Sequence, residues 1–220
     1  METISIIGAT GALGGGLAKR WARAGYSIII GSRDAGRAEI AAQQLNEQVG
    51  GDLVSGLDNA DAAAAGEIVV LAVKFQHQAD TLKQIKPGVQ GKILVDTTVP
   101  LVPPKVARVQ LPAEGSAGLI TQQSVGDSVK VVSAFQSIAA EVLNSGEAIE
   151  CDVLVTGDDV TAREKVIQLA KAAGMRAWHA GPLANSAAAE ALTSVLIHVN
   201  KRYGSDHAGI QINGVPLKSS

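Results

Sequence analysis

Cysteine, aromatic residues and charge are all scarce in this chain of 220 residues, and each shortage excludes something. The single cysteine, Cys151, cannot form a disulfide within the chain. Two residues each of Trp, Tyr and Phe, with a net charge of −2, argue against a nucleic-acid surface, which needs stacking rings and basic groups. No apolar run approaches the roughly 20 residues that cross a bilayer, so we expect no membrane partner. The N-terminus lacks the pattern of a signal peptide, which predicts a cytoplasmic protein.

Short β-rich runs alternate with longer Ala-rich segments of helical spacing, the pattern of βα units around a parallel sheet. The sequence therefore predicts an α/β fold of the Rossmann type, a doubly wound and mainly parallel sheet with a small helical C-terminal part. The predicted strands span residues 3–7, 27–30, 68–73, 92–96, 130–134, 152–156 and 176–179. Crossover helices are expected to end at Gly25 and at the pair Gly50 and Gly51. A later helix has Thr161 and Glu164 at capping-box spacing.

The chain is expected to divide into a dinucleotide-binding domain, residues 1–180, and a small C-terminal part, residues 181–220. The second part opens with a helix that places Leu192, Val195, Leu196 and Val199 on one face. Ala-rich positions on this helix allow either core packing or a dimer contact. Residues 96–112 carry several prolines and are predicted to form an irregular segment at the sheet edge where α/β proteins bind ligands.

A glycine-rich turn follows the first predicted strand in "SIIGATGALGGGLAKRW". Gly8 permits a tight turn, Gly11 lets a pyrophosphate approach the backbone, and Gly14 lets the helix pack closely on the strand. The helix N-terminus supplies free N–H groups and the positive end of a dipole. This context predicts dinucleotide binding, although purely structural glycines would give the same pattern.

The second predicted strand, in "SIIIGSRD", ends without the acid that usually binds the ribose hydroxyls of NAD. Ser32 and Arg33 stand there, and Arg37 follows one helical turn later. A carboxylate would repel a 2′-phosphate, whereas a hydroxyl and two guanidinium groups can donate charge-assisted hydrogen bonds to it. The sequence therefore favours NADP, with Thr10 as a further hydroxyl for the phosphates. The alternative is that both arginines are ordinary solvated residues.

No acid/base constellation is recognisable. Short-chain dehydrogenases share the glycine turn but need a Tyr with a Lys four residues later, and here Tyr26 is followed by Ile30 and Tyr203 by His207. Neither C-x-x-C nor H-x-x-x-H metal spacing occurs. We therefore predict no catalytic side chain and no metal, and a reaction in which two bound cofactors carry the chemistry.

The sequence resembles the F420-dependent NADP oxidoreductases, also called NADPH-dependent F420 reductases, over nearly its whole length. The resemblance rests on "IIGATGALGGGLA", "GSRDAGRAE", "VDTTVPL", "KVVSAFQSIAA", "DVLVTGDD", "AGPLANS", "EALTSVLIHVN" and "HAGIQING", in that order. It implies a homodimer in which hydride passes directly between C4 of the nicotinamide of NADP(H) and C5 of the deazaflavin coenzyme F420.

The resemblance also assigns cofactor-binding positions. It implies that the 2′-phosphate is held by Thr10, Ser32, Arg33 and Arg37, and that the pyrophosphate is lined by Gly8, Gly11, Ala12 and Leu13. The nicotinamide side comprises Ala72, Val73, Lys74 and Pro100, and the F420 side comprises Ala134, Gln136, Ser137 and Ile138.

Two departures from the family pattern keep other functions open. Gln136 stands where the family has His or Asn, with Ala139 in place of a proline, and Lys74 stands where relatives tend to have a Pro-Trp pair. Gln136 can donate a hydrogen bond but cannot act as an acid, and Lys74 is either a solvated residue or a cation for an anionic ligand. The alternatives are an NADPH-dependent reductase of a flavin or an imine, and a non-enzymatic module that senses NADP.

Overall fold

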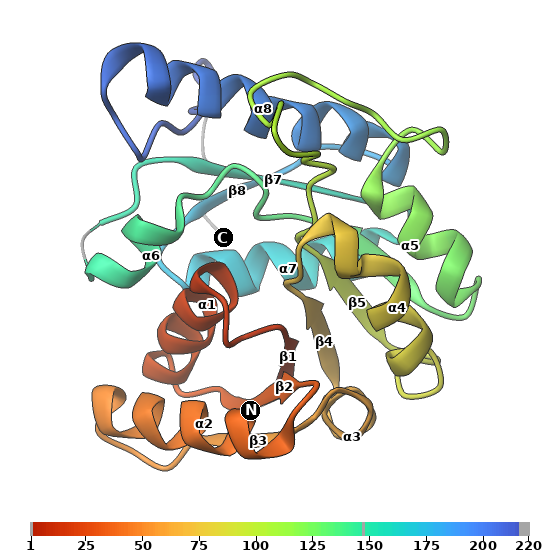
Figure 1. Ribbon diagram of the computed structural model, residues 1–220, viewed down its shortest axis with the longest axis vertical. Coiled ribbons are helices and arrows are strands. Elements are labelled where there is room, and N and C mark those ends of the chain that lie inside the picture. Colours follow the sequence, from red (N-terminus) through yellow and green to blue (C-terminus); the bar gives the residue numbers. More distant parts are fainter. Residues whose placement is uncertain (1, 147, 216–220) are drawn as a thin grey trace.

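The computed structural model describes residues 2–146 and 148–215, and its strands form one sheet in the order β3-β2-β1-β4-β5-β6-β7-β8 (Figure 1). Neighbouring strands run parallel from β3 to β6, β7 is antiparallel to β6, and β8 is parallel to β7. The strands are β1 (Thr3–Ile7), β2 (Ser27–Ser32), β3 (Val54–Asp58), β4 (Ile68–Leu71), β5 (Ile93–Asp96), β6 (Lys130–Ser133), β7 (Asp152–Gly157) and β8 (Arg176–His179).

Helices cover both faces of the sheet, as a doubly wound fold requires. One apolar core, with Trp21 fully buried in it, joins the sheet to α1, α2 and α7, and a second core joins the other face to α3, α4 and α5. The helices are α1 (Ala12–Arg23), α2 (Ala35–Val49), α3 (Asn59–Ala65), α4 (Phe75–Ile85), α5 (Ala117–Val125), α6 (Ala140–Ser145), α7 (Val160–Ala172), the 3₁₀ turn η1 (Leu183–Asn185) and α8 (Ser186–Tyr203). The predicted fold class is confirmed.

The strand register places the C-terminal ends of several strands at one edge of the sheet. Ile7 pairs with Gly31 on one side and with Leu71 on the other. Leu71 in turn pairs with Asp96, which pairs with Ser133. The segments that follow β1, β2, β4, β5 and β6 therefore leave the sheet side by side, at the edge where α/β proteins bind ligands.

Two features differ from the sequence-based expectation. No strand was expected at Val54–Asp58, because only Val54 is buried in this edge strand and Gly56 interrupts the apolar pattern. The predicted capping box at Thr161 and Glu164 is wrong. The N-cap of α7 is Asp159, whose carboxylate accepts a hydrogen bond from the Ala162 amide at 2.7 Å.

The C-terminal part is dominated by α8, which lies along the sheet near β7 (Figure 1). Leu192, Val195, Leu196 and Val199 all belong to this helix, as predicted. Residues 97–116, which include most of the predicted irregular segment, contain no regular helix or strand. The division at residues 180 and 181 and the cytoplasmic location stay predictions, and residues 216–220 lie outside the described residues. Within the described residues, no helix is long and apolar enough to cross a membrane.

Candidate cofactor-binding site

The turn after β1 has the close approach that its glycines predicted. Gly8 has φ +91°, and a Cβ atom there would lie 2.5 Å from the carbonyl oxygen of Ala72. A Cβ atom on Gly14 would lie 2.8 Å from the Cα atom of Ala9. Gly11 is the N-cap of α1 and provides no side-chain cap, so the first amides of the helix lack a side-chain acceptor. This arrangement suits a phosphate group, which can accept hydrogen bonds from those amides.

A cleft of about 610 Å³ opens beside this turn, which we call the nucleotide cleft. Nine of the predicted site residues line it: Gly8, Thr10, Gly11, Ser32, Arg33, Arg37, Ala72, Val73 and Lys74. Its remaining lining residues are Asp34, Asn59, His77, Asp80, Thr81 and Gln84. The glycine turn, the end of β2 and the segment after β4 thus meet around one space of the size that small ligands occupy.

The cationic groups in the nucleotide cleft are exposed and weakly paired. Arg37 has a side chain that is 79% exposed, and its Nε atom lies 3.9 Å from Asp34. Such exposed pairs contribute little to stability. The Asp34 carboxylate caps α2 by accepting from the Arg37 amide at 3.2 Å, and the Ser32 hydroxyl accepts from the Asp34 amide at 3.3 Å. Because Asp34 is engaged at the helix start, the guanidinium groups of Arg33 and Arg37 can turn toward an incoming anion.

Of the residues predicted on the NADP side, three lie outside the nucleotide cleft. Ala12 lines a smaller hollow of about 240 Å³ together with Thr10 and Gly11. Leu13 is partly buried and packs against the core. Pro100 is buried and is not part of the cleft wall.

One wall of the nucleotide cleft was not anticipated from the sequence. Asn59 at the start of α3 is 5% exposed, and its Nδ2 atom donates to the Gln84 Oε1 atom of α4 at 3.1 Å. Recognition of β3 would have pointed to Asn59, because that residue directly follows the strand at the ligand-binding edge.

Three of the residues predicted on the F420 side lie together under α8. Gln136, Ser137 and Ile138 line a pocket of about 150 Å³ with Thr193 and Leu196 of α8, among others, which we call the α8 pocket. The Gln136 side chain points inward, and its Nε2 atom donates to Ser133 Oγ at 2.7 Å and to the Asp96 carbonyl oxygen at 3.2 Å. The remaining residue, Ala134, is fully buried.

Two buried acids outside these spaces could not be recognised from the sequence. Asp96 and Glu190 are 1% and 0% exposed. Burial raises the pKa of Asp96, and hydrogen bonds from Thr121, Thr98 and Gln78 oppose the rise. Burial also raises the pKa of Glu190 to about 7, although the amides of Ala117 and Gly118 donate to its carboxylate.

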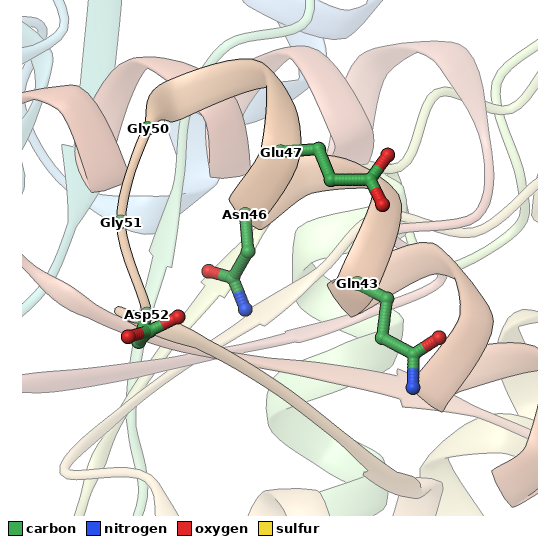
Figure 2. Close-up of a pocket in the computed structure, with 6 residues that line it drawn as sticks. All are labelled: Gln43, Asn46, Glu47, Gly50, Gly51 and Asp52. Carbon is green, nitrogen blue, oxygen red and sulfur yellow. The ribbon is translucent and has the colours of Figure 1, made fainter.

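Another hollow, of about 540 Å³, lies at the C-terminal end of α2 (Figure 2). Its lining is Gln43, Asn46, Glu47, Gly50, Gly51 and Asp52, and it shares no residue with the nucleotide cleft. Two carboxylates and no cation among these side chains make it unsuited to a phosphate group. Among the described residues there is also no cluster of three His, Cys, Asp or Glu that could hold a metal ion.

Comparisons with known proteins identify the family of this chain. A sequence model of the family described as NADP oxidoreductase, coenzyme F420-dependent, matches residues 3–100. The F420-dependent NADP reductase of Methanocaldococcus jannaschii is 39% identical, with 97% of this chain and 99% of that protein aligned. The enzyme of the same name from Methanothermobacter thermautotrophicus is 40% identical, covering 97% of this chain and 95% of that protein.

A crystal structure from Arthrobacter sp. FB24, 26% identical in sequence, superimposes with a TM-score of 0.79 and covers 97% of this chain and all of that one. The similarity in sequence and in fold thus extends across both the nucleotide cleft and the α8 pocket. This chain belongs to the F420-dependent NADP oxidoreductase family.

Proposed function

We propose that this protein transfers a hydride between NADPH and coenzyme F420. Its full-length relatives carry the name F420-dependent NADP reductase. The observation that carries the proposal is the nucleotide cleft. It combines a glycine turn fit for a pyrophosphate with two exposed guanidinium groups at the end of β2. When both ligands are bound, C4 of the nicotinamide supplies the hydride that C5 of the deazaflavin accepts.

The proposal that NADP is the bound nucleotide rests on the amide, hydroxyl and guanidinium groups near the glycine turn. Gly8 and Gly11 lie in the turn before α1, and Ala12 is the first residue of α1. Main-chain amides at this helix start can hold the pyrophosphate. Thr10, Ser32, Arg33 and Arg37 share the nucleotide cleft with Gly8 and Gly11 and would hold the 2′-phosphate through hydroxyl and guanidinium groups. NADH lacks this phosphate, so the arginines would select NADPH.

The nicotinamide would lie near Ala72, Val73 and Lys74, which continue the cleft past the end of β4. Leu13 and Pro100 would act indirectly, since Leu13 packs against the core and Pro100 is a buried residue of the segment that follows β5. The chain's own contribution is then to bind, orient and shield the reacting rings rather than to transfer protons.

We place F420 against the loop that follows β6, with Ala134, Gln136, Ser137 and Ile138, and against α8. The α8 pocket, at about 150 Å³, is smaller than the roughly 300 Å³ of most ligand sites, so it would take only one edge of the deazaflavin. Residues 181–220 would form the small part that completes this side of the site.

A second copy of the chain could enclose the rest of the F420 site. Val195 of α8 is 47% exposed, and Val109 and Leu111 in the loop after β5 are 43% and 52% exposed. We propose a homodimer in which such apolar surface is covered, with light scattering as the test.

The experiment that tests the function is an absorbance assay of F420 reduction by the purified protein with NADPH and, in parallel, with NADH. We expect rapid bleaching of oxidised F420 with NADPH and little with NADH. Reduction of a flavin or an imine but not of F420 would favour another acceptor. NADPH binding without turnover of any of these acceptors would favour the sensing module.

A further inference from the structure

Asp96, the last residue of β5, joins three separate elements through its buried carboxylate. Its Oδ2 atom accepts from Gln78 Nε2 of α4 at 3.0 Å and from Thr121 Oγ1 of α5 at 2.6 Å. Its Oδ1 atom accepts from the Thr98 amide at 2.8 Å. All three partners are donors, which matches the acceptor-only character of an ionised carboxylate. One side chain thus fixes α4, α5 and the start of the segment after β5.

The main chain of Asp96 also holds the loop that lines the α8 pocket. Its carbonyl oxygen accepts from the Ala134 amide at 3.1 Å and from Gln136 Nε2 at 3.2 Å. Between these two donors lies Phe135, a buried residue with φ +73°, whose ring packs edge to face on Trp21 at 5.9 Å. A left-handed backbone at a non-glycine residue is unfavourable and persists only where its neighbours enforce it. Asp96 supplies part of that enforcement.

Helix α8 is connected to the same network. Gln78 Nε2 donates to the Ala117 carbonyl oxygen at 3.0 Å, and the Ala117 amide donates to Glu190 of α8 at 2.7 Å. Thr193, also on α8, donates through its hydroxyl to the Gln136 carbonyl oxygen at 2.9 Å. A continuous series of buried and partly buried hydrogen bonds therefore runs from α4, one wall of the nucleotide cleft, to both walls of the α8 pocket.

We infer that Asp96 is a positioning residue that sets the separation and the angle between the ligand in the nucleotide cleft and the ligand in the α8 pocket. The inference rests on the proposed function, which needs two rings in contact. Asp96 belongs to the lining of neither space. Its effect would be exerted through the walls, and hydride transfer is sensitive to such displacement, since about 1 Å of misplacement can cost roughly 100-fold in rate.

The test is the variant Asp96→Asn, which preserves side-chain size but turns an amide donor toward one of the three existing donors. We expect kcat for F420 reduction to fall by about 10- to 100-fold. The dissociation constants of NADPH and F420 should stay within about threefold, because neither ligand touches Asp96. With NADPH deuterated at the transferred position, the isotope effect on kcat should increase, because hydride transfer becomes slower relative to product release.

The variant Thr121→Val removes one donor without adding another, and it decides the matter if Asp96→Asn does not fold. We expect the same pattern with a smaller loss of kcat, about threefold to tenfold. The matched control is Val125→Ala, also in α5 and 1% exposed, which creates a cavity without removing any contact of Asp96. This control should lower stability but leave kcat and the isotope effect unchanged.

Folded Asp96→Asn or Thr121→Val protein with an unchanged kcat and isotope effect would overturn the inference while leaving the proposed function standing. Val125→Ala producing the same kinetic change would also overturn it, because general loosening would then be the cause. If the unaltered protein does not reduce F420, both the proposed function and this inference fail.

Discussion

The nucleotide cleft and the buried acids Asp96 and Glu190 place their charges in opposite environments. Arg37 in the cleft is 79% exposed along its side chain and has only a weak partner 3.9 Å away. Asp96 and Glu190 are 1% and 0% exposed and accept several hydrogen bonds from within the protein. The exposed cations remain available to an external phosphate, whereas the buried acids are already occupied by the elements that they hold together. Exposure thus separates groups that recognise a ligand from groups that hold its site in shape.

The largest effect is expected where the cleft depends on backbone shape rather than on charge. Gly8→Ala would place a Cβ atom 2.5 Å from the Ala72 carbonyl oxygen at a residue with φ +91°. We expect the unfolding free energy to fall by about 3 kcal/mol and the NADPH dissociation constant to rise by more than about 100-fold. Urea unfolding and fluorescence titration measure both. Gly51→Ala, which has open space around it, is the control and should change neither.

Glu190→Gln tests the buried side of the comparison, through the pH dependence of the unfolding free energy. The folded-state pKa of Glu190 is raised from 4.5 to about 7, so between these values the folded protein holds a proton that the unfolded chain releases. The unfolding free energy therefore falls as pH rises through this window, by at most about 3 kcal/mol. Glutamine does not titrate, so the variant should lack this part of the slope, whereas the contribution of Asp96 remains in both proteins.

Urea unfolding of both proteins at several pH values between 4.5 and 8 measures the difference. Identical slopes for Glu190→Gln and the unaltered protein would show that the buried carboxyl does not titrate in this range. The comparison between exposed and buried charges would then lose its electrostatic basis.

Arg33→Ala tests the exposed side of the comparison. The loss of a charge-assisted hydrogen bond to the 2′-phosphate should weaken NADPH binding by about 1.5–3 kcal/mol and leave NADH binding nearly unchanged. Isothermal titration with both nucleotides gives the two values. Lys171→Ala, which removes an exposed cation at the end of α7, is the charge-matched control. An equal loss for NADPH and NADH would refute the selective role of Arg33.

The smallest effect is expected at Lys74, which lines the nucleotide cleft from the segment after β4, whereas the arginines line it from the end of β2 and the start of α2. Removal of this cation in Lys74→Ala should weaken NADPH and NADH by the same factor, at most about fivefold, because an exposed charge contributes up to about 1 kcal/mol. Titration with both nucleotides again separates the outcomes. A selective loss of NADPH would mean that Lys74, and not only the arginines, contacts the 2′-phosphate.

The nucleotide cleft was largely predictable because its signals are local in the sequence. Gly8 and Gly11 follow the first strand, Ser32 ends the second and Arg33 follows it, so the parallel arrangement alone brings these residues together. The strands at 3–7 and 176–179 were also predicted at their observed bounds, because their signals too are local in the sequence. Asn59 was missed because its strand, β3, is a mostly exposed edge strand without a clear apolar pattern.

The buried network could not be predicted, because it depends on contacts between residues far apart in the chain. Asp96 meets Thr121 and Gln78 from two different helices, and Glu190 reaches α5 from 72 residues away. In the sequence, both acids look like ordinary polar residues. The inward direction of Gln136 was hidden in the same way, since its partners Ser133 and Asp96 are fixed only by sheet pairing.

The central claim is that hydride passes directly between the two ligands with no proton-transferring side chain. The most direct measurement is mass spectrometry of the F420 product after reaction with NADPH deuterated at the transferred position. We expect one deuterium at C5 of reduced F420 and none in the solvent. Loss of the label to water, or its retention in NADPH with F420 unreduced, would contradict the account.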